Sequence, residues 1–355
     1  MKIIFESSIF LHQSIGGISK YICNINDIFQ KKNIDSIIYS PLSINNNLNT
    51  KKNYNISYFK FKKIPRFCSK LFYLINDLAT FFLINLSKPD IIHFSYYNNF
   101  LLRFIKIPYI LTVYDLINEK KRYVDKKFSK KKLIQNASHI ICISKTTAKD
   151  LIKYYNVDKK KVSTVYLGVE NKKKLLVKKK NFILYVGSRN RYKNYINFIK
   201  AYSESNYLIK NYKVICFGSN SFNLEEIQLI KKLKIENNVF FESGSDKILG
   251  KFYQNASLFV APSKNEGFGL TPLEAMSFGC PTICSDITIF KEILQNSCCY
   301  INPNNINDIK QKMENVLKSK KKQKILIKKG LLKIKQYSWN KCALETIEVY
   351  KKVLN

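Results

Sequence analysis

Apolar and polar positions follow a pattern that predicts parallel sheets. Short runs of consecutive apolar residues are separated by longer stretches in which apolar residues recur every three or four positions. The runs are typical of strands buried on both faces, and the longer stretches are typical of amphipathic helices. In the first half the predicted strands are residues 3–6, 36–39, 91–94, 109–114, 139–143 and 162–166, with helices between them, for example at 18–29 and 146–155.

The same pattern starts again in the second half. Strands are predicted at 182–186, 213–217, 239–241, 258–261 and 282–284, and helices begin near Asn194, Asn223, Lys247, Thr271 and Ile289. The polar, lysine-rich stretch 170–181 has no apolar period and marks a boundary. We therefore expect two doubly wound α/β domains facing each other. Ligands of such sheets bind beyond the carboxyl ends of the strands, so the expected site lies in the cleft between the domains.

Charge suggests a partner but does not identify one. The 355 residues include 61 Lys+Arg and 25 Asp+Glu, a net charge of +36, while 46% are hydrophobic, which excludes a disordered polycation. Such basicity suits nucleic acid or an anionic membrane. However, the excess divides almost evenly, +17 in residues 1–170 and +19 in residues 171–355. This favours compositional bias over a selected nucleic-acid patch, and we expect no nucleic-acid partner.

Three lysine-rich segments stand out locally. Segment 120–132 is interpreted as part of a membrane-facing surface, 172–180 as a linker and 318–329 as the solvated face of a helix.

Several classes of protein are disfavoured. The longest apolar stretch, 71–86, is interrupted by Asn76 and Asp77 and is too short to span a bilayer. Glu6 falls where the apolar region of a signal peptide would continue, so secretion is not expected. The nine scattered cysteines suit a reducing compartment, and their spacing does not predict a metal site. The expected location is the cytoplasm, including the inner face of its membrane.

The most informative segment runs from Glu266 to Met276. Two glycines, Gly267 and Gly269, lie in a loop that leads directly into a helix, and such a loop is an anion site suited to phosphate. Glu274, one turn into that helix, is placed to accept hydrogen bonds from ribose hydroxyls, and Glu266 to bind sugar hydroxyls. The alternative interpretation is a glycine-rich turn with two exposed glutamates.

These residues resemble the signature of the family 4 retaining glycosyltransferases. The signature is the pair Glu266 and Glu274 enclosing Gly-Phe-Gly-Leu-Thr-Pro-Leu. Further similar segments are 185–194, with the sequence Tyr-Val-Gly-Ser-Arg-Asn-Arg-Tyr-Lys-Asn, then 16–21, 141–145 and 337–350. The resemblance implies a GT-B fold, with an acceptor-binding domain at 1–170, a donor-binding domain at 181–336 and a helix at 337–355 that crosses back to the first domain.

The resemblance also implies a site. Its catalytic residues are Glu266, Arg189 and Lys193, of which Arg189 and Lys193 stabilise the departing diphosphate. The donor is a UDP- or GDP-linked sugar, used without a metal or other cofactor, and the acceptor is a glycan or lipid-linked hydroxyl of surface polysaccharide or lipopolysaccharide. The implied donor-binding residues are Gly16, Gly17, Gly187, Asn194, Gly267, Phe268, Gly269, Leu270, Thr271 and Glu274.

One position departs from the family pattern. Tyr114 precedes Asp115 where the family often has a histidine that faces the transferred sugar, which suggests an altered sugar preference. Asp115 is either a sugar or acceptor contact or a strand-end cap, and Ser144 either reaches the sugar or caps the next helix. His12 and His93 are interpreted as structural or acceptor-side groups rather than bases, and His139 as the start of a strand.

Other functions stay open. Within the same fold they are a sugar-nucleotide epimerase or a phosphorylase, and paired carboxylates also occur in glycosidases. The alternative from another class is a non-catalytic basic protein that binds membrane or nucleic acid. The donor base, the sugar and the acceptor are not predicted.

Overall fold

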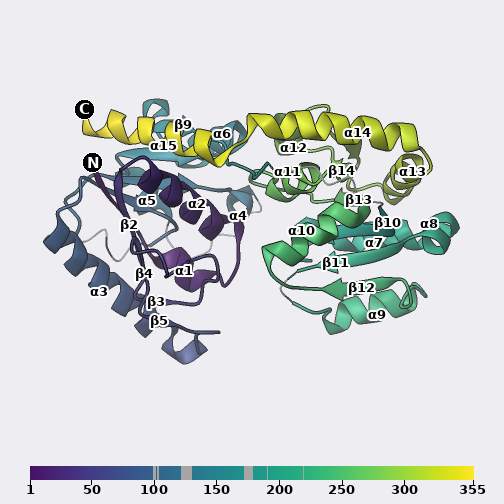
Figure 1. The fold of residues 1–355 in the computed structure, drawn as a ribbon, viewed down its shortest axis with the longest axis horizontal. Coiled ribbons are helices and arrows are strands. Elements are labelled where there is room, and N and C mark those ends of the chain that lie inside the picture. The colour runs from purple at the N-terminus through teal and green to yellow at the C-terminus, as the bar shows by residue number, and fades with distance from the viewer. Residues whose placement is uncertain (99–100, 102–103, 121–129, 172–178, 190, 219) are drawn as a thin grey trace. The chain divides into compact units, whose positions relative to one another are not determined.

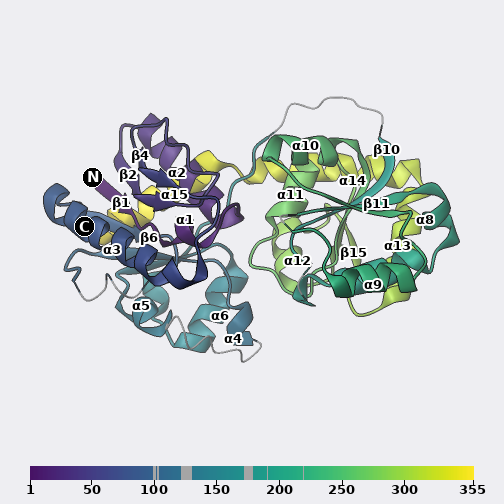
Figure 2. The same ribbon diagram turned by 90° about the horizontal axis from the view of Figure 1, so that it is seen from below.

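The computed structural model forms two compact units. The first comprises Met1–Gly168 and Trp339–Asn355, and the second comprises Val169–Ser338. Figures 1 and 2 show the helices and strands of each unit. The structure describes residues 1–98, 101, 104–120, 130–171, 179–189, 191–218 and 220–355.

The first unit is built on a seven-stranded parallel sheet. Strand β1 lies in the sheet interior, where Ile4 pairs with Ile37 of β2 on one side and Ile92 of β6 on the other. Ile4, Ile92 and the neighbouring apolar side chains are fully buried, because helices cover both faces. The strand order is β4 (Asn55–Ile56), β2 (Asp35–Tyr39), β1 (Lys2–Phe5), β6 (Ile91–Phe94), β7 (Tyr109–Val113), β8 (His139–Cys142) and β9 (Val162–Thr164).

The last helix of the chain returns to this unit. Helix α15 (Trp339–Leu354) packs against α2 and β8. Its Tyr350 is fully buried, with the hydroxyl bonded to Nδ1 of His93 and the ring edge-on to Phe29. The other helices of the unit are α1 (Ser8–His12), α2 (Gly17–Lys31), α3 (Ser69–Ser87), α4 (Ile117–Lys120), α5 (Lys130–Asn136) and α6 (Lys145–Tyr155), and a two-stranded sheet pairs β3 (Leu42–Ser43) with β5 (Phe59–Lys60).

The second unit is built on a six-stranded parallel sheet. Central strand β10 pairs with β11 and β13, and its Ile183 and Leu184 are fully buried. The order is β12 (Val239–Glu242), β11 (Lys213–Phe217), β10 (Lys180–Val186), β13 (Ala256–Ala261), β14 (Thr282–Ser285) and β15 (Cys299–Ile301). The helices are α7 (Tyr195–Ser203), α8 (Asn206–Asn211), α9 (Leu224–Lys232), α10 (Asp246–Asn255), α11 (Leu270–Ser277), α12 (Thr288–Leu294), α13 (Ile306–Leu317) and α14 (Lys320–Lys333).

All eleven predicted strands are present, with small changes at their ends. Strand β7 stops at Val113, one residue before the predicted end, and β10 begins at Lys180, inside the segment interpreted as a linker. The pattern missed β3, β4, β5 and β15, because strands of two or three residues are too short to stand out. It also predicted no helix at α3, in which polar residues are buried and apolar residues are exposed.

Candidate functional site

The carboxyl edge of the second unit's sheet carries an ion pair between two predicted residues. Lys193 follows β10 and Glu266 follows β13, and the two strands are neighbours in the sheet. The Nζ of Lys193 lies 2.8 Å from Oε1 of Glu266. Their side chains are 21% and 15% exposed, so the pair is partly shielded but reachable from solvent. The topology therefore joins two residues that are 73 positions apart.

Backbone geometry explains two of the glycines. Gly187, directly after β10, has a φ of 124°, and a Cβ built there would have open space within 4 Å. Gly269, directly before α11, has a φ of 101°, and a Cβ there would lie 2.8 Å from the Phe290 ring. Both angles disfavour other residues. At Gly187 the open space leaves room for a ligand to approach the backbone, whereas at Gly269 the space is filled by protein.

Asn194 holds the loops of this edge together. It adopts a left-handed conformation, with a φ of 58°, directly before α7. Its buried Nδ2 donates to the carbonyls of Pro262, at 3.0 Å, and Pro303, at 2.7 Å. Asn194 therefore fixes the loops after β13 and β15 beside Lys193, which makes it a positioning residue.

Helix α11 begins inside the glycine loop. Leu270 and Thr271 form its first turn, which contains no acidic side chain, so the positive end of the helix dipole is not neutralised by the helix itself. Phe268 is buried edge-on against Tyr337, at 5.8 Å between ring centroids, and anchors the loop. Gly267 lies in the same loop.

Glu274 lies in the second turn of α11 and is half-buried. The Tyr253 hydroxyl donates to its Oε2 at 3.3 Å. Tyr253 itself is fully buried, and burial followed by the Glu274 charge raises the pKa of its hydroxyl well above the usual value. Tyr253 therefore stays protonated and orients the carboxylate.

Arg189 forms an ion pair with a different acidic residue, Glu226. Its Nε lies 2.9 Å from Oε1 of Glu226, and its Nη2 donates to the carbonyls of Asn220 and Ser221. Its side chain is only 6% exposed. Its guanidinium lies 4.9 Å from the centre of the Phe222 ring. Arg189 therefore holds the loop after β11 and helix α9, and the prediction that Arg189 and Lys193 act together on a diphosphate stays a prediction.

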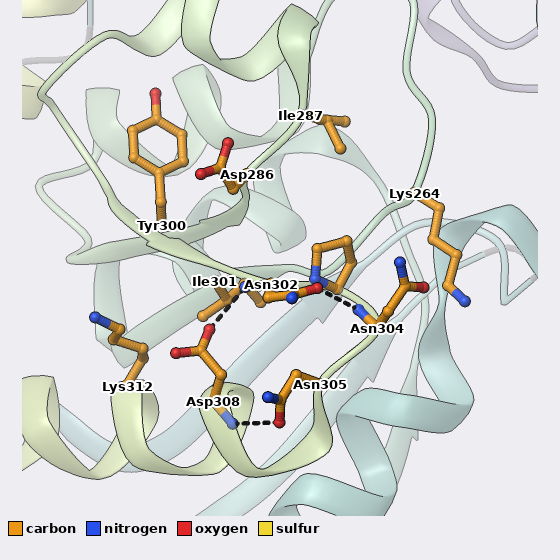
Figure 3. Close-up of a pocket in the computed structure, with 11 residues that line it drawn as sticks. Lys264, Asp286, Ile287, Tyr300, Ile301, Asn302, Asn304, Asn305, Asp308 and Lys312 are labelled. Carbon is orange, nitrogen blue, oxygen red and sulfur yellow. Dashed lines mark hydrogen bonds between the residues drawn. The ribbon is translucent and has the colours of Figure 1, made fainter.

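Two cavities open along this side of the unit. One, of about 570 Å³, adjoins Gly187 and Arg189. The other, of about 610 Å³, lies past the ends of β14 and β15 (Figure 3). There Asp308 accepts from the Asn302 amide at 2.7 Å, and Asn305 accepts from the Asp308 amide at 3.0 Å. These side chains stabilise the start of α13, and the mixed lysines and aspartates of the lining do not favour one class of ligand.

Gly16 and Gly17 belong to the first unit, at the start of α2. Gly16 is the N-terminal cap, with an extended backbone. A Cβ on Gly16 would lie 2.1 Å from Oε1 of Gln13, so a larger residue would displace that side chain. The Ser19 hydroxyl donates to the Gly16 carbonyl at 3.1 Å. The Gln13 amide is the end of a flexible side chain, so packing alone does not require glycine at position 16, and the predicted contact of Gly16 with the donor stays a prediction.

The three residues predicted to contact the sugar or acceptor have different environments. Ser144 is fully buried and accepts from the Thr147 amide at 3.0 Å, so it caps α6. Asp115 accepts from the Ile117 amide at 3.1 Å, which fixes the turn into α4. These bonds are the capping alternatives that the sequence left open. Tyr114 differs from both, because its buried hydroxyl has no hydrogen-bond partner among the described residues.

The first unit also holds a buried carboxylate network that the sequence did not reveal. Glu6, fully buried after β1, accepts from the Ser8 amide at 2.6 Å and from Asn98 at 3.2 Å. Asn98 also donates to Asp77 of α3 at 2.6 Å. Burial raises the pKa of Glu6, and burial followed by the Glu6 charge raises the pKa of Asp77 to about 7. Only the fold brings residues 6, 77 and 98 together, so no sequence spacing signals this network.

His139 begins β8, as predicted, and the interpretation of His12 and His93 as structural or acceptor-side groups stays a prediction. Burial lowers the pKa of His93 to about 3, and its Nε2 lies 2.7 Å from the Thr112 hydroxyl. Burial, with Lys352 nearby, lowers the pKa of His139 to about 4. His12 stacks on Tyr96 at 4.8 Å.

The lysine-rich segments are only partly described. Residues 121–129 and 172–178 lie outside the described residues, so the interpretations of segments 120–132 and 172–180 stay predictions. Residues 320–322 begin α14 and are exposed, in agreement with a solvated helix face.

Comparison with known proteins identifies the family. The model described as glycosyl transferases group 1 matches residues 169–332, and that of glycosyltransferase family 4 matches residues 15–173. The chain is 33% identical over 196 residues to the O-antigen chain mannosyltransferase RfbU of Salmonella typhimurium, which covers 54% of each protein. It is 26% identical over 246 residues to the O-antigen chain mannosyltransferase B of Escherichia coli, covering 65% of this chain and 64% of that one. The matches thus span less than two thirds of these relatives.

A solved structure agrees on the fold. The Anabaena protein Alr3699/HepE, solved in complex with UDP-glucose, superposes with a TM-score of 0.74 at 15% identity, over 98% of this chain and 99% of that one. The two parallel α/β units are those of the predicted GT-B fold. Together the two family models account for nearly the whole chain, and the chain belongs to the GT-B glycosyltransferases of group 1 and family 4.

Proposed function

We propose that the chain transfers a hexose from a nucleoside diphosphate sugar to a hydroxyl of a glycan or lipid-linked acceptor, with retention of configuration. The observation that carries this proposal is the Lys193–Glu266 pair at the start of the glycine loop that leads into α11. A cation beside the positive end of a helix is suited to a diphosphate, and the neighbouring carboxylate to sugar hydroxyls.

The proposed reaction exchanges one bond at the anomeric carbon. The bond from this carbon to the diphosphate oxygen breaks, and a bond to the acceptor oxygen forms on the same face of the sugar. The acceptor proton passes to the departing diphosphate, so no protein base is required. The charge that grows on the diphosphate is stabilised by Lys193 and the first turn of α11, and the proposal needs no metal.

Other residues support binding in this proposal. Glu274, oriented by the buried Tyr253, receives the ribose hydroxyls, a contact that does not distinguish UDP from GDP. Gly187 lets the diphosphate approach the backbone. Arg189 would have to leave Glu226 to reach phosphate, so we assign it the role of shaping the cavity beside Gly187.

The relatives suggest the sugar and the product. Both curated relatives are named O-antigen chain mannosyltransferases, so we propose mannose as the first sugar to test and a surface polysaccharide or lipopolysaccharide as the product. The proposed place of action is the cytoplasm, at the inner face of the membrane.

A binding panel tests the donor site directly. UDP, GDP, ADP and their sugars are added at millimolar concentration to the wild type and to Glu266→Gln, and the shift in melting temperature is measured. At about one hundred times the dissociation constant a ligand adds about 2.7 kcal/mol of stability, which gives a clear shift. We expect one nucleotide series to stabilise the wild type, and Glu266→Gln to lose the contribution of the sugar.

The matched control is Glu236→Gln, which changes an exposed glutamate of the same unit. This variant should show the same ligand-induced shift in melting temperature as the wild type. The absence of any shift in the wild type would contradict the donor site. Conversion of a sugar nucleotide to an isomer without an acceptor would indicate an epimerase instead.

A further inference from the structure

Helix α3 has the reverse of the usual arrangement of polar and apolar residues. A surface helix normally turns its apolar stripe to the core and its polar face to water. In α3 the buried residues are Asn76, Asp77, Thr80 and Ile84, so three of the four are polar. The reversal explains why its sequence pattern did not predict an amphipathic helix.

The inward polar groups are satisfied, so the orientation of α3 is well defined. Asn76 Oδ1 accepts from the Leu42 amide at 2.9 Å, and its Nδ2 donates to the Leu42 carbonyl at 2.9 Å. Asp77 accepts from Asn98, and Thr80 donates to the Asn76 carbonyl at 2.7 Å. Turning the helix to bury its apolar side would break the bonds of Asn76 with Leu42 and of Asp77 with Asn98, which is costly for buried polar groups.

The opposite side of α3 is apolar and exposed. Leu86 is 85% exposed and Phe82 is 62% exposed, and Phe67, just before the helix, is 89% exposed. We call this surface the α3 face; its residues are Phe67, Leu71, Leu74, Ile75, Leu78, Phe82 and Leu86, which recur every three or four positions. Contiguous apolar surface of this kind marks an interaction site.

Basic residues border the α3 face. The adjoining strand β5 and the loop after it expose Lys60, Lys62 and Lys63, and the first turn of α3 exposes Lys70. Aromatic residues join the two segments, because Phe61 meets Phe72 with ring centroids 4.9 Å apart. Tyr58 and Phe59 are also exposed there, at 68% and 62%. The surface therefore combines apolar side chains with a positive border.

We propose that the α3 face binds the surface of a bilayer that contains anionic phospholipids. Apolar side chains would enter the region between headgroups and acyl chains, while the lysines meet the headgroup charge. The helix would lie on the surface, since no helix in the described part of the chain is both long and apolar enough to cross a bilayer. A second copy of the chain fits less well, because self-pairing would bring two lysine borders together in a chain of charge +36.

The inference goes beyond sugar transfer and does not depend on it, because lipid binding is measured without donor or acceptor. The purified full chain is mixed with vesicles of phosphatidylglycerol and phosphatidylethanolamine, or of phosphatidylcholine alone, and the bound fraction is measured by flotation. We expect binding to the anionic vesicles that weakens at high salt. The double variant Phe82→Glu/Leu86→Glu should bind at least about tenfold more weakly.

Two further variants make the test specific. Leu332→Glu changes a leucine that is 55% exposed on α14, outside the α3 face, and should bind like the wild type. Lys62→Ser/Lys63→Ser should bind several-fold more weakly at low salt and show a smaller salt effect. Circular dichroism melts check the fold, and Phe82→Ser/Leu86→Ser provides an uncharged replacement of the apolar pair.

Three results would overturn the proposal. The first is no binding of the wild type to anionic vesicles. The second is equal binding by the wild type and both Phe82/Leu86 variants. The third is a wild-type dimer in analytical ultracentrifugation that the Phe82/Leu86 variants convert to a monomer, which would assign the α3 face to a second copy of the chain.

Discussion

The carboxyl edges of the two sheets contain acidic residues in opposite electrostatic environments. In the second unit Glu266 meets Lys193 at 2.8 Å, and both side chains reach solvent. In the first unit Glu6 is fully buried, and it accepts hydrogen bonds from the neutral groups of Ser8, Ser95 and Asn98. Burial therefore raises the pKa of Glu6.

The difference shows that the same sheet topology can place a carboxylate in two different electrostatic environments. Parallel strands bring loops from distant parts of the sequence to the same edge, but the loop side chains decide the charge there. The edge with Lys193 and the start of α11 favours an anion such as a diphosphate. In the first unit the carboxyl of Glu6 is instead buried among neutral hydrogen-bond donors.

The largest expected effect comes from removing the cation of the second unit. Lys193→Met should lower the rate of sugar transfer by about 10²–10³, because one positioned charge is lost from the departing diphosphate. The melting temperature should change little, since a partly exposed ion pair contributes only about 1 kcal/mol or less. Steady-state kinetics and thermal melts measure the two effects. Lys251→Met, on the exposed side of α10, is the control and should behave like the wild type.

Replacing Arg189 should lower the free energy of unfolding more than it lowers the rate of sugar transfer. Arg189→Met leaves Glu226 and two carbonyls without their partner, so we expect the free energy of unfolding to fall by about 3 kcal/mol. Urea unfolding measures this loss, and Arg189→Lys should restore part of it. If Arg189→Met instead abolished transfer with stability unchanged, the phosphate role implied by the sequence resemblance would be right.

Replacement of Asp77 tests whether the buried carboxylates of the first unit are protonated in the folded protein. Its pKa is raised from 3.8 to about 7 in the folded protein, so folding favours the protonated form. The stability that this group contributes is complete below about pH 4 and is lost as the pH rises toward 7, because the unfolded chain ionises first. Asp77→Asn should therefore be about 2–4 kcal/mol more stable than the wild type at pH 8.

At pH 4 the wild type and Asp77→Asn should have nearly the same free energy of unfolding. Urea unfolding at both pH values gives the comparison, and Asp35→Asn, at an exposed position of β2, controls for the loss of a negative charge. A difference that does not depend on pH would show that the Asp77 carboxyl titrates normally.

The smallest expected effect is that of Tyr114→Phe. The hydroxyl has no partner among the described residues, so its removal should leave the unfolding free energy unchanged within about 1 kcal/mol. If the hydroxyl meets a sugar, the KM for acceptor or donor should rise several-fold at an unchanged melting temperature. Unchanged kinetics would assign Tyr114 to packing beside Tyr21, whose ring lies 6.0 Å away.

Local sequence predicted most of the fold and, within the candidate site, the glycine loop before α11. Buried parallel strands such as Phe182–Val186 stand out because both faces are covered, so nearly every residue is apolar. The glycine loop before α11 also stands out, because its residues are adjacent in the chain. The α3 face did not stand out. The polar residues of α3 point inward, and their hydrogen bonds depend on the rest of the fold.

The sequence by itself determined the two α/β units, the family and the separate candidate residues Lys193 and Glu266, because these follow from short-range patterns. The tertiary structure decided which charges meet. It placed Lys193 against Glu266, turned Arg189 to Glu226 and gathered Glu6, Asp77 and Asn98 into one network. Such pairings join residues from about 20 to more than 90 positions apart, and only the strand order of the sheets brings them within hydrogen-bond distance.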